Sequence, residues 1–302
     1  MLDILTRAGC FVAIILLGFT LRRTGVFGPE TFGVLSKVVM KITLPAALIA
    51  SAAGKPIDAS MLTIALLGLI GGVFYILAGW LMQLKGSRSE KAFFIQNVPG
   101  YNIGTFALPF TQSFLGPVGV LTTSIFDLGN AVICFGGSFS IARAVKDGGK
   151  ADFRRILKTA VSSIPFLTHV TMVVLNLNSL TLPGPVLTLA EILGGGNACL
   201  AMLMIGVSMN ISIDTRKLGT IVKVLAARYG IAVLLALAYY HLLPFSLEIR
   251  QTLVILAFSP IGSTVPIFTA ELGEDVGLSS TINSIAIVIS IVIIVTLLTV
   301  ML

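Results

Sequence analysis

The stretch NVPGYNIGTFALPF (residues 97–110) interrupts an apolar segment that is otherwise long enough to cross a membrane. It holds two prolines, two glycines and two asparagines, which disfavour a continuous helix. Within hydrocarbon, backbone that leaves the helical pattern is tolerated only where it is buried in protein or lines a cavity. The stretch therefore predicts a helix that breaks inside the membrane for a functional reason.

A second segment, SPIGSTVPIF (residues 259–268), is interrupted in the same way. The first break continues into PFTQSFLG (residues 109–116) and the second into PIFTAELG (residues 266–273), so both copies read Pro-x5-Leu-Gly. They fall at corresponding places in the two halves of the chain. The match predicts an internal repeat that contains one broken helix in each half.

The composition is that of a polytopic membrane protein. Of 302 residues, 56% are hydrophobic and 11% are charged, and the mean hydropathy is +1.02. A soluble domain carries about a quarter of charged residues, and a membrane helix needs about 20 apolar ones. We expect ten spans joined by short connections, at residues 8–25, 31–53, 61–83, 92–115, 119–142, 159–178, 186–210, 219–243, 250–271 and 279–301.

The cations are placed asymmetrically around these segments. Lysine and arginine cluster after every second span, at Arg22 and Arg23, at residues 85–91, at residues 143–158 and at Arg216 and Lys217. Such clusters favour the cytoplasmic side, so both termini are expected outside and the central linker inside. The net charge of +7 then reflects topology and gives no reason to expect a nucleic-acid partner.

These patterns together predict the fold class. We expect an all-α polytopic membrane protein with ten transmembrane helices in two inverted five-helix repeats, in which broken helices four and nine cross. The first repeat would span residues 1–142, the linker residues 143–158 and the second repeat residues 159–302. With five spans in each half, the second half must have the opposite orientation in the membrane, as in many secondary transporters.

The two breaks supply the candidate binding site. Half-helix amino ends would bring positive dipole ends to the middle of the membrane, which suits an anion, whereas freed carbonyls could instead bind a cation. The predicted substrate-binding residues combine hydrogen-bonding side chains with helix breakers: Asn97, Asn102, Gly104, Thr105, Pro109, Ser259, Gly262, Ser263, Thr264 and Pro266.

Charged residues inside the spans form a second group of candidates. Asp127 lies in the fifth span, and a carboxylate inside a membrane span indicates a functional role because burying its charge is costly. It could carry a coupling proton or pair with Lys41 of the second span. Lys41 could equally extend to the membrane interface, as we expect for Lys37 and Arg228. Asn130 lies one turn beyond Asp127 and would either join helices or line a polar pocket.

Other classes of protein have no support in the sequence. There is no His-Glu-x-x-His and no Gly-x-Ser-x-Gly motif, and the three cysteines lie far apart in apolar runs. His169 and His241 are close in sequence to no cysteine or second histidine. We therefore expect no enzyme, no metal site and no cofactor apart from a coupling ion, H⁺ or, less favoured, Na⁺.

Four stretches resemble the auxin efflux carrier family, which includes bacterial malate or malonate permease-like proteins. They are KITLPAALIASAA in the second span, residues 102–109 in the fourth, MLMIGVSMNISI in the seventh and VPIFTAELGED in the ninth. The likeness covers essentially the whole chain. Ala107 departs from it, because many bacterial relatives have glycine two residues before the proline.

The resemblance implies a fold in which spans four and nine cross near Pro109 and Pro266. The crossing spans would belong to a transport domain that moves against a scaffold containing spans one, two, six and seven. It also implies an organic anion bound near Asn102, a homodimer, and a bacterial-type member in the plasma membrane, the inner membrane of the cell. The short linker gives no sign of phosphoregulation.

We therefore predict a secondary transporter that moves small organic anions by alternating access. A sodium-coupled symporter of the bile-acid type shares the repeat plan but would need several carboxylates at the crossing. A membrane sensor that binds without transporting is the alternative from another class.

Overall fold

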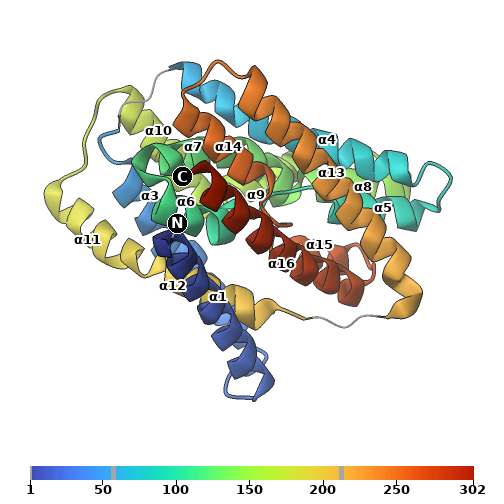
Figure 1. The fold of residues 1–302 in the computed structure, drawn as a ribbon. Coiled ribbons are helices and arrows are strands. Elements are labelled where there is room, and N and C mark those ends of the chain that lie inside the picture. Colours follow the sequence, from blue (N-terminus) through green and yellow to red (C-terminus); the bar gives the residue numbers. More distant parts are fainter. Residues whose placement is uncertain (1, 56–58, 211–213) are drawn as a thin grey trace.

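The structure, a computed structural model, describes residues 2–55, 59–210 and 214–302, and the described chain is helical (Figure 1). Among these described residues, seven helices are long and apolar enough to cross a membrane. This confirms the prediction of an all-helical polytopic membrane protein. The seven are α1 (Leu2–Arg23); α2, η1 and α3 (Thr31–Val38, Val39–Thr43, Leu44–Ala52); α4 (Thr63–Met82); α7, η4 and α8 (Gly116–Val132, Ile133–Gly137, Ser138–Asp147); α11 and α12 (Gly184–Gly195, Asn197–Ser208); η5 and α13 (Thr215–Lys217, Leu218–Leu242); and α16 (Val276–Met301).

The other three predicted segments contain shorter helices. The sixth is α10 (Ile164–Leu177), which follows the short helix α9 (Phe153–Val161). The fourth and ninth are the interrupted segments. They divide into α5 (Arg88–Asn97), η3 (Ile103–Ala107) and α6 (Leu108–Phe114), and into α14 (Leu247–Ala257) and α15 (Val265–Glu271).

Local sequence explains where the first broken segment begins and ends. Ser87 and Glu90 form a capping box at the start of α5, in which the Ser87 backbone N–H donates to the Glu90 carboxylate over 2.8 Å. The helix stops at Asn97, two residues before Pro99, because proline lacks the N–H that would continue the ladder and restricts the residue before it. Gly100 then adopts a φ of +86°, which glycine adopts without strain.

Glycines allow two pairs of long helices to pack closely. α1 and α12 lie together at one edge of the molecule (Figure 1), and a Cβ atom on Gly206 of α12 would approach the Ile15 carbonyl oxygen to 2.0 Å. α4 and α7 meet in the same way, since a Cβ atom on Gly129 would lie 1.8 Å from the Ala65 oxygen. Small residues at such crossings let membrane helices gain packing energy without a hydrophobic driving force.

Candidate functional site

The two broken segments contact each other directly. The backbone N–H of Asn102, in the first break, donates a 2.9 Å hydrogen bond to the carbonyl oxygen of Pro260, in the second. The non-helical residues between α5 and η3 therefore meet those between α14 and α15. The predicted encounter of the fourth and ninth segments is present in the structure. We call the place where the two breaks meet, around Asn102 and Pro260, the crossing.

An asparagine from the helix that follows each break holds the interrupted backbone. Asn130 of α7 donates to the Tyr101 carbonyl over 2.9 Å and accepts from the Tyr101 N–H over 3.0 Å. Asn283 of α16 donates to the Gly262 carbonyl over 3.2 Å. Asn130 thus satisfies the backbone groups of the first break, a role that is neither of the two predicted for it. Asn283 was not among the predicted residues, although an amide in the middle of an apolar span is a visible signal.

Arg228 of α13 joins the two breaks from a third direction. Its guanidinium donates to the Val98 carbonyl over 2.8 Å and to the Ser259 carbonyl over 2.6 Å, just after the ends of α5 and α14. It lies over the rings of Tyr75 and Tyr101, at 5.0 and 5.6 Å from their centroids. The side chain is fully buried, so the prediction that Arg228 extends to the membrane interface is wrong. Buried carbonyls and aromatic faces stabilise the charge where it lies.

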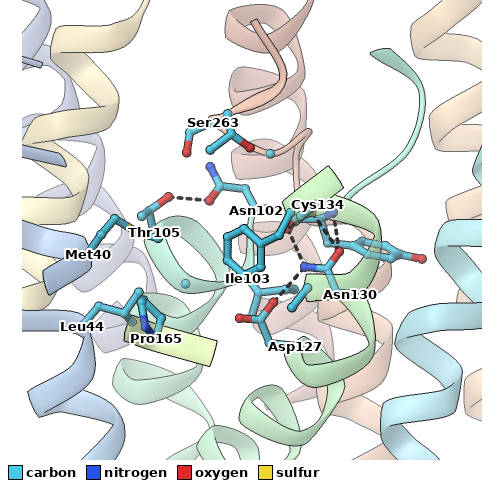
Figure 2. A pocket seen from close by; sticks show the side chains of 16 residues that line it. Met40, Leu44, Asn102, Ile103, Thr105, Asp127, Asn130, Cys134, Pro165 and Ser263 are labelled. Carbon is cyan, nitrogen blue, oxygen red and sulfur yellow. Dashed lines mark hydrogen bonds between the residues drawn. The ribbon is translucent and has the colours of Figure 1, made fainter. Parts of the chain in front are cut away.

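A narrow cavity of about 60 Å³ opens beside the crossing (Figure 2). Its polar lining comes from both breaks and from α7, and its other walls are η1, α3, η4 and the first turn of α10. Six predicted substrate-binding residues line it, together with Asp127 and Asn130: Asn102, Gly104, Thr105, Gly262, Ser263 and Thr264. The Nδ2 atom of Asn102 is buried there without a hydrogen-bond partner, while its Oδ1 accepts from the Thr105 hydroxyl.

A second cavity, of about 270 Å³, reaches the crossing from another direction. It shares Asn102 and Ser263 with the first cavity and is otherwise lined from α12, α15 and α16 and the region joining α1 to α2. Arg22, Asn210, Pro266, Asn283 and Ser284 are among its lining residues. The crossing is therefore approached by two cavities that have two residues in common.

Three predicted substrate-binding residues line neither of these two cavities. Asn97 bridges α5, α15 and α16: it donates to the Phe93 carbonyl and the Thr269 hydroxyl and accepts from Ser279. Pro109 lies buried in the first turn of α6, where its fixed φ suits a helix start. Ser259 contributes its carbonyl to Arg228. The substrate role of all ten residues stays a prediction.

Asp127 has a partner different from the one predicted. Its carboxylate accepts from Asn130 over 2.8 Å and forms an ion pair with His169 of α10, whose Nε2 lies 3.3 Å away. Lys41 is exposed on η1, so the predicted pairing of Asp127 with Lys41 is wrong. His169 was not predicted as the partner of Asp127. A histidine in an apolar span is itself a signal.

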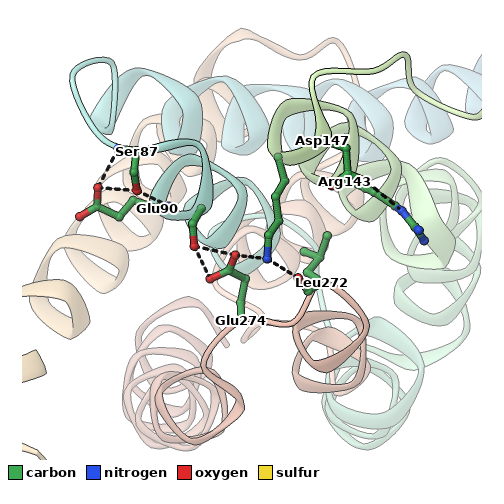
Figure 3. Close-up of polar contacts among 8 residues, drawn as sticks. Ser87, Glu90, Arg143, Asp147, Leu272 and Glu274 are labelled. Atoms are coloured by element: carbon green, nitrogen blue, oxygen red, sulfur yellow. Dashed lines mark hydrogen bonds and ion pairs between the residues drawn. The ribbon is translucent and has the colours of Figure 1, made fainter.

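The turn after the second broken segment is fastened to the first half of the chain (Figure 3). Glu274 accepts from Ser89 at the start of α5 over 2.7 Å and pairs with Lys146 of α8 at 2.6 Å. Lys146 also donates to the Leu272 carbonyl. Since Glu274, Lys146 and Ser89 come from three separate segments, this network fixes the outer ends of both broken spans relative to each other.

Comparison with known proteins agrees with this architecture. Residues 10–150 match a family described as membrane transport protein. An uncharacterized transporter of Methanothermobacter thermautotrophicus is 24% identical over 288 residues, which cover 93% of each chain. Both matches lead to transporters and neither to an enzyme. Taken with the apolar, all-helical fold, the two matches support a multi-pass membrane transporter whose residues 10–150 are similar to the membrane transport protein family.

Proposed function

We propose that the protein is a secondary transporter that moves a small organic anion by alternating access, with the crossing of the two broken segments as its binding site. The observation that carries this proposal is Arg228. Its charge is buried at the crossing, and among the described residues no carboxylate pairs with it. The crossing therefore holds a positive charge deep in the protein that no carboxylate of the described residues neutralises.

The helix dipoles add to this charge. α5 and α14 point their carboxyl ends, which carry negative partial charge, at Val98 and Ser259, and Arg228 binds those carbonyls. The amino ends of η3 and α15, which carry positive partial charge, begin beside Asn102 and Ser263. Arg228 thus neutralises the negative helix ends, whereas the positive ends of η3 and α15 lie beside the cavity. The site therefore favours a carboxylate over a cation.

The side chains at the crossing suit the same ligand. Asn102 Nδ2 is a buried donor without a partner, which a carboxylate oxygen would satisfy. Ser263 and Thr264 place hydroxyls in the first cavity. Asp127, the carboxylate of that cavity, is already paired with His169, which leaves the region poor in the clustered carboxylates that a sodium site would need.

The two cavities support alternating access. Both reach Asn102 and Ser263, and both lie between the broken segments on one side and a wall containing parts of spans one, two, six or seven on the other. We propose that these spans form the scaffold and that the body carrying the breaks moves against it, so that each cavity opens in turn while the other closes.

The inverted-repeat plan with repeats at residues 1–142 and 159–302 is part of this proposal. The equivalent tasks of Asn130 and Asn283, each in the helix after a break, support it. We also propose, from the family likeness, a homodimer in a bacterial inner membrane with both termini outside.

The test is uptake by proteoliposomes across a panel of labelled mono- and dicarboxylates, with proton and sodium gradients imposed separately. We expect flux of at least one carboxylate, and a loss of about 10- to 100-fold in Asn102→Ala, because one hydrogen bond to a charged group is lost. Pro109→Ala should also impair flux without preventing membrane insertion, because it relaxes the start of α6.

Matched controls are Asn178→Ala and Pro185→Ala, exposed residues at the end of α10 and the start of α11 that should leave flux unchanged. Full flux in both Asn102→Ala and Pro109→Ala would remove the crossing from the mechanism. Saturable binding without flux would favour a sensor, and sodium-dependent flux would favour the symporter.

A further inference from the structure

The ion pair between Asp127 and His169 is buried within the membrane-spanning part of the protein. The side chains are 16% and 5% exposed, and they come from α7 and α10. α7 follows the first broken segment, and α10 belongs to the wall that faces it across the narrow cavity. The pair therefore joins the two bodies whose relative movement the proposed function requires.

Burial makes the number of protons on this pair matter. A carboxylate beside a neutral imidazole carries a net negative charge, which is costly away from water. With one more proton the pair is neutral overall, whether the proton lies on His169 Nε2 or on the Asp127 carboxyl. Contact between α7 and α10 consequently favours the state that holds one proton. Separation of the two helices exposes the groups to water and weakens that preference.

One residue connects the pair to the substrate site. Asn130 donates to the Asp127 carboxylate and also holds both backbone groups of Tyr101, next to Asn102. A change of charge or position at Asp127 therefore acts on the backbone of the first break through a single side chain. Figure 2 shows Asp127, Asn130 and Asn102 around the same cavity.

The surroundings contain few competing titratable groups. In the cavity lining the others are Cys134 and Tyr101. Of the elements packed on α7 or α10, α3, α6 and η3 carry none, α4 carries Tyr75, η1 carries the exposed Lys41, and α14 carries Glu248 and Arg250 in its first turn. α9 carries Arg154, Arg155 and Lys158, and Arg228 lies behind Tyr101.

We propose that Asp127 and His169 together form the proton-binding site of the transporter, and that one proton bound there accompanies each substrate cycle. The inference rests on the proposed transport function. The proton is taken from water on one side when α7 and α10 approach each other, and it is released to water on the other side when they separate. No bond other than the one to the proton forms or breaks.

The experiment separates proton-driven accumulation from exchange. In proteoliposomes with the membrane potential clamped, the panel carboxylate that the wild type moves fastest is followed under a pH difference of about one unit, which can support about a tenfold gradient per coupled proton. Asp127→Asn and His169→Gln should lose this accumulation. His169→Gln, which changes a residue outside the cavity lining, should keep exchange of labelled for unlabelled substrate within about threefold of the wild type, since exchange needs no net proton movement.

Asp127→Glu, which keeps the carboxyl, should retain part of the accumulation, and His241→Gln, at the exposed end of α13, should retain all of it. Accumulation as in the wild type in both Asp127→Asn and His169→Gln would overturn the proposal. Accumulation by the wild type that does not respond to the pH difference would also overturn it. Loss of exchange together with accumulation in His169→Gln would overturn it too, because that result indicates a purely structural contact between the two helices.

A second measurement needs no substrate. The melting temperature of the purified protein is recorded from pH 5 to pH 8, the range in which histidine ordinarily titrates. We expect it to fall with rising pH in a step that is present in the wild type and His241→Gln and absent from Asp127→Asn and His169→Gln. The same profile in all four proteins would overturn the proton site. Absence of flux for every carboxylate would overturn the proposed function instead, and the melting profiles would still decide the proton site.

Discussion

Replacement of Arg228 by methionine removes the charge that joins the two broken segments while keeping a side chain of similar length. Two carbonyls, those of Val98 and Ser259, lose hydrogen bonds of 2.8 and 2.6 Å. Bonds to a charged group contribute about 1.5–3 kcal/mol each, which gives a gross loss of about 3–6 kcal/mol. Part of this is offset, because methionine does not have to be desolvated and Arg228 Nε has no partner. We expect a net loss of about 3 kcal/mol in the free energy of unfolding.

The same substitution should weaken substrate binding. For a carboxylate held about 8 Å from the guanidinium at an effective dielectric constant of about 20, the attraction is about 2 kcal/mol, or about thirtyfold in affinity. Arg228→Lys keeps the charge but lacks the planar fork that reaches both carbonyls. It should therefore lose stability as the methionine variant does and keep most of the affinity.

The assays are the melting temperature in detergent and the concentration dependence of uptake in proteoliposomes. Arg250→Met is the matched control, because Arg250 also donates to a carbonyl, the partly buried one of Tyr240 at 2.8 Å, and lies over a tyrosine ring. It lines neither cavity at the crossing. Equal affinity in Arg228→Met, Arg228→Lys and the wild type would refute the assignment of anion preference to Arg228.

Three further predictions concern the frame around the site. Gly129→Ala should lower the free energy of unfolding by about 2 kcal/mol or more, because the new Cβ atom would overlap the Ala65 carbonyl. Gly230→Ala, which has open space around it, should be neutral or slightly stabilising in thermal unfolding. Asn130→Leu should lower the free energy of unfolding by about 2–4 kcal/mol and Asn283→Leu by about 1–2 kcal/mol, because Asn130 makes two backbone hydrogen bonds at its break and Asn283 makes one. Equal melting temperatures of the two variants would contradict this prediction. Lys217 and the Leu278 N–H lower the pKa of Asp275 at the start of α16, so the contribution of Asp275 to stability is present above about pH 4 and is lost as the pH falls further. Since the pair is partly exposed, Asp275→Asn should remove under about 1 kcal/mol at neutral pH, seen as a smaller difference in melting temperature between pH 7 and about pH 2.

The breaks were predictable from the sequence because their signal is local. Proline and glycine act on their own backbone, so NVPGYNIGTFALPF and SPIGSTVPIF indicate broken helices without any knowledge of their neighbours. The hydrophobic runs were predictable for a similar reason, since a membrane requires a fixed length of apolar helix. The predicted contact between the breaks needed one more step, the repeat of Pro-x5-Leu-Gly in both halves.

The partners of the charged residues were not predictable, because they depend on rotations of helices about their own axes. Arg228 near the start of a long apolar helix fits extension to the interface as well as burial, and only the packing of α13 against both breaks decides between them. Lys41, His169 and Asp127 all lie inside segments predicted to span the membrane, so the sequence alone allows either residue as the partner of Asp127. A rotation of η1 that turns Lys41 outward leaves His169 as the partner.

Two broken helices inside a membrane would be unstable unless their backbone groups were satisfied without a ligand, since a carrier must also exist empty. The structure meets this condition in three ways: Asn102 N–H binds the Pro260 carbonyl, Asn130 and Asn283 hold the two loops, and Arg228 binds the last carbonyls. What remains unsatisfied in the cavities includes Asn102 Nδ2 and Asn283 Oδ1. Part of the polar capacity that the fold does not use thus lies where a substrate would bind, while other buried polar atoms of the described residues also lack a partner elsewhere in the fold. It follows that substitutions at Asn130 and Arg228 should act first on stability, whereas those at Asn102 should act on transport at nearly unchanged stability.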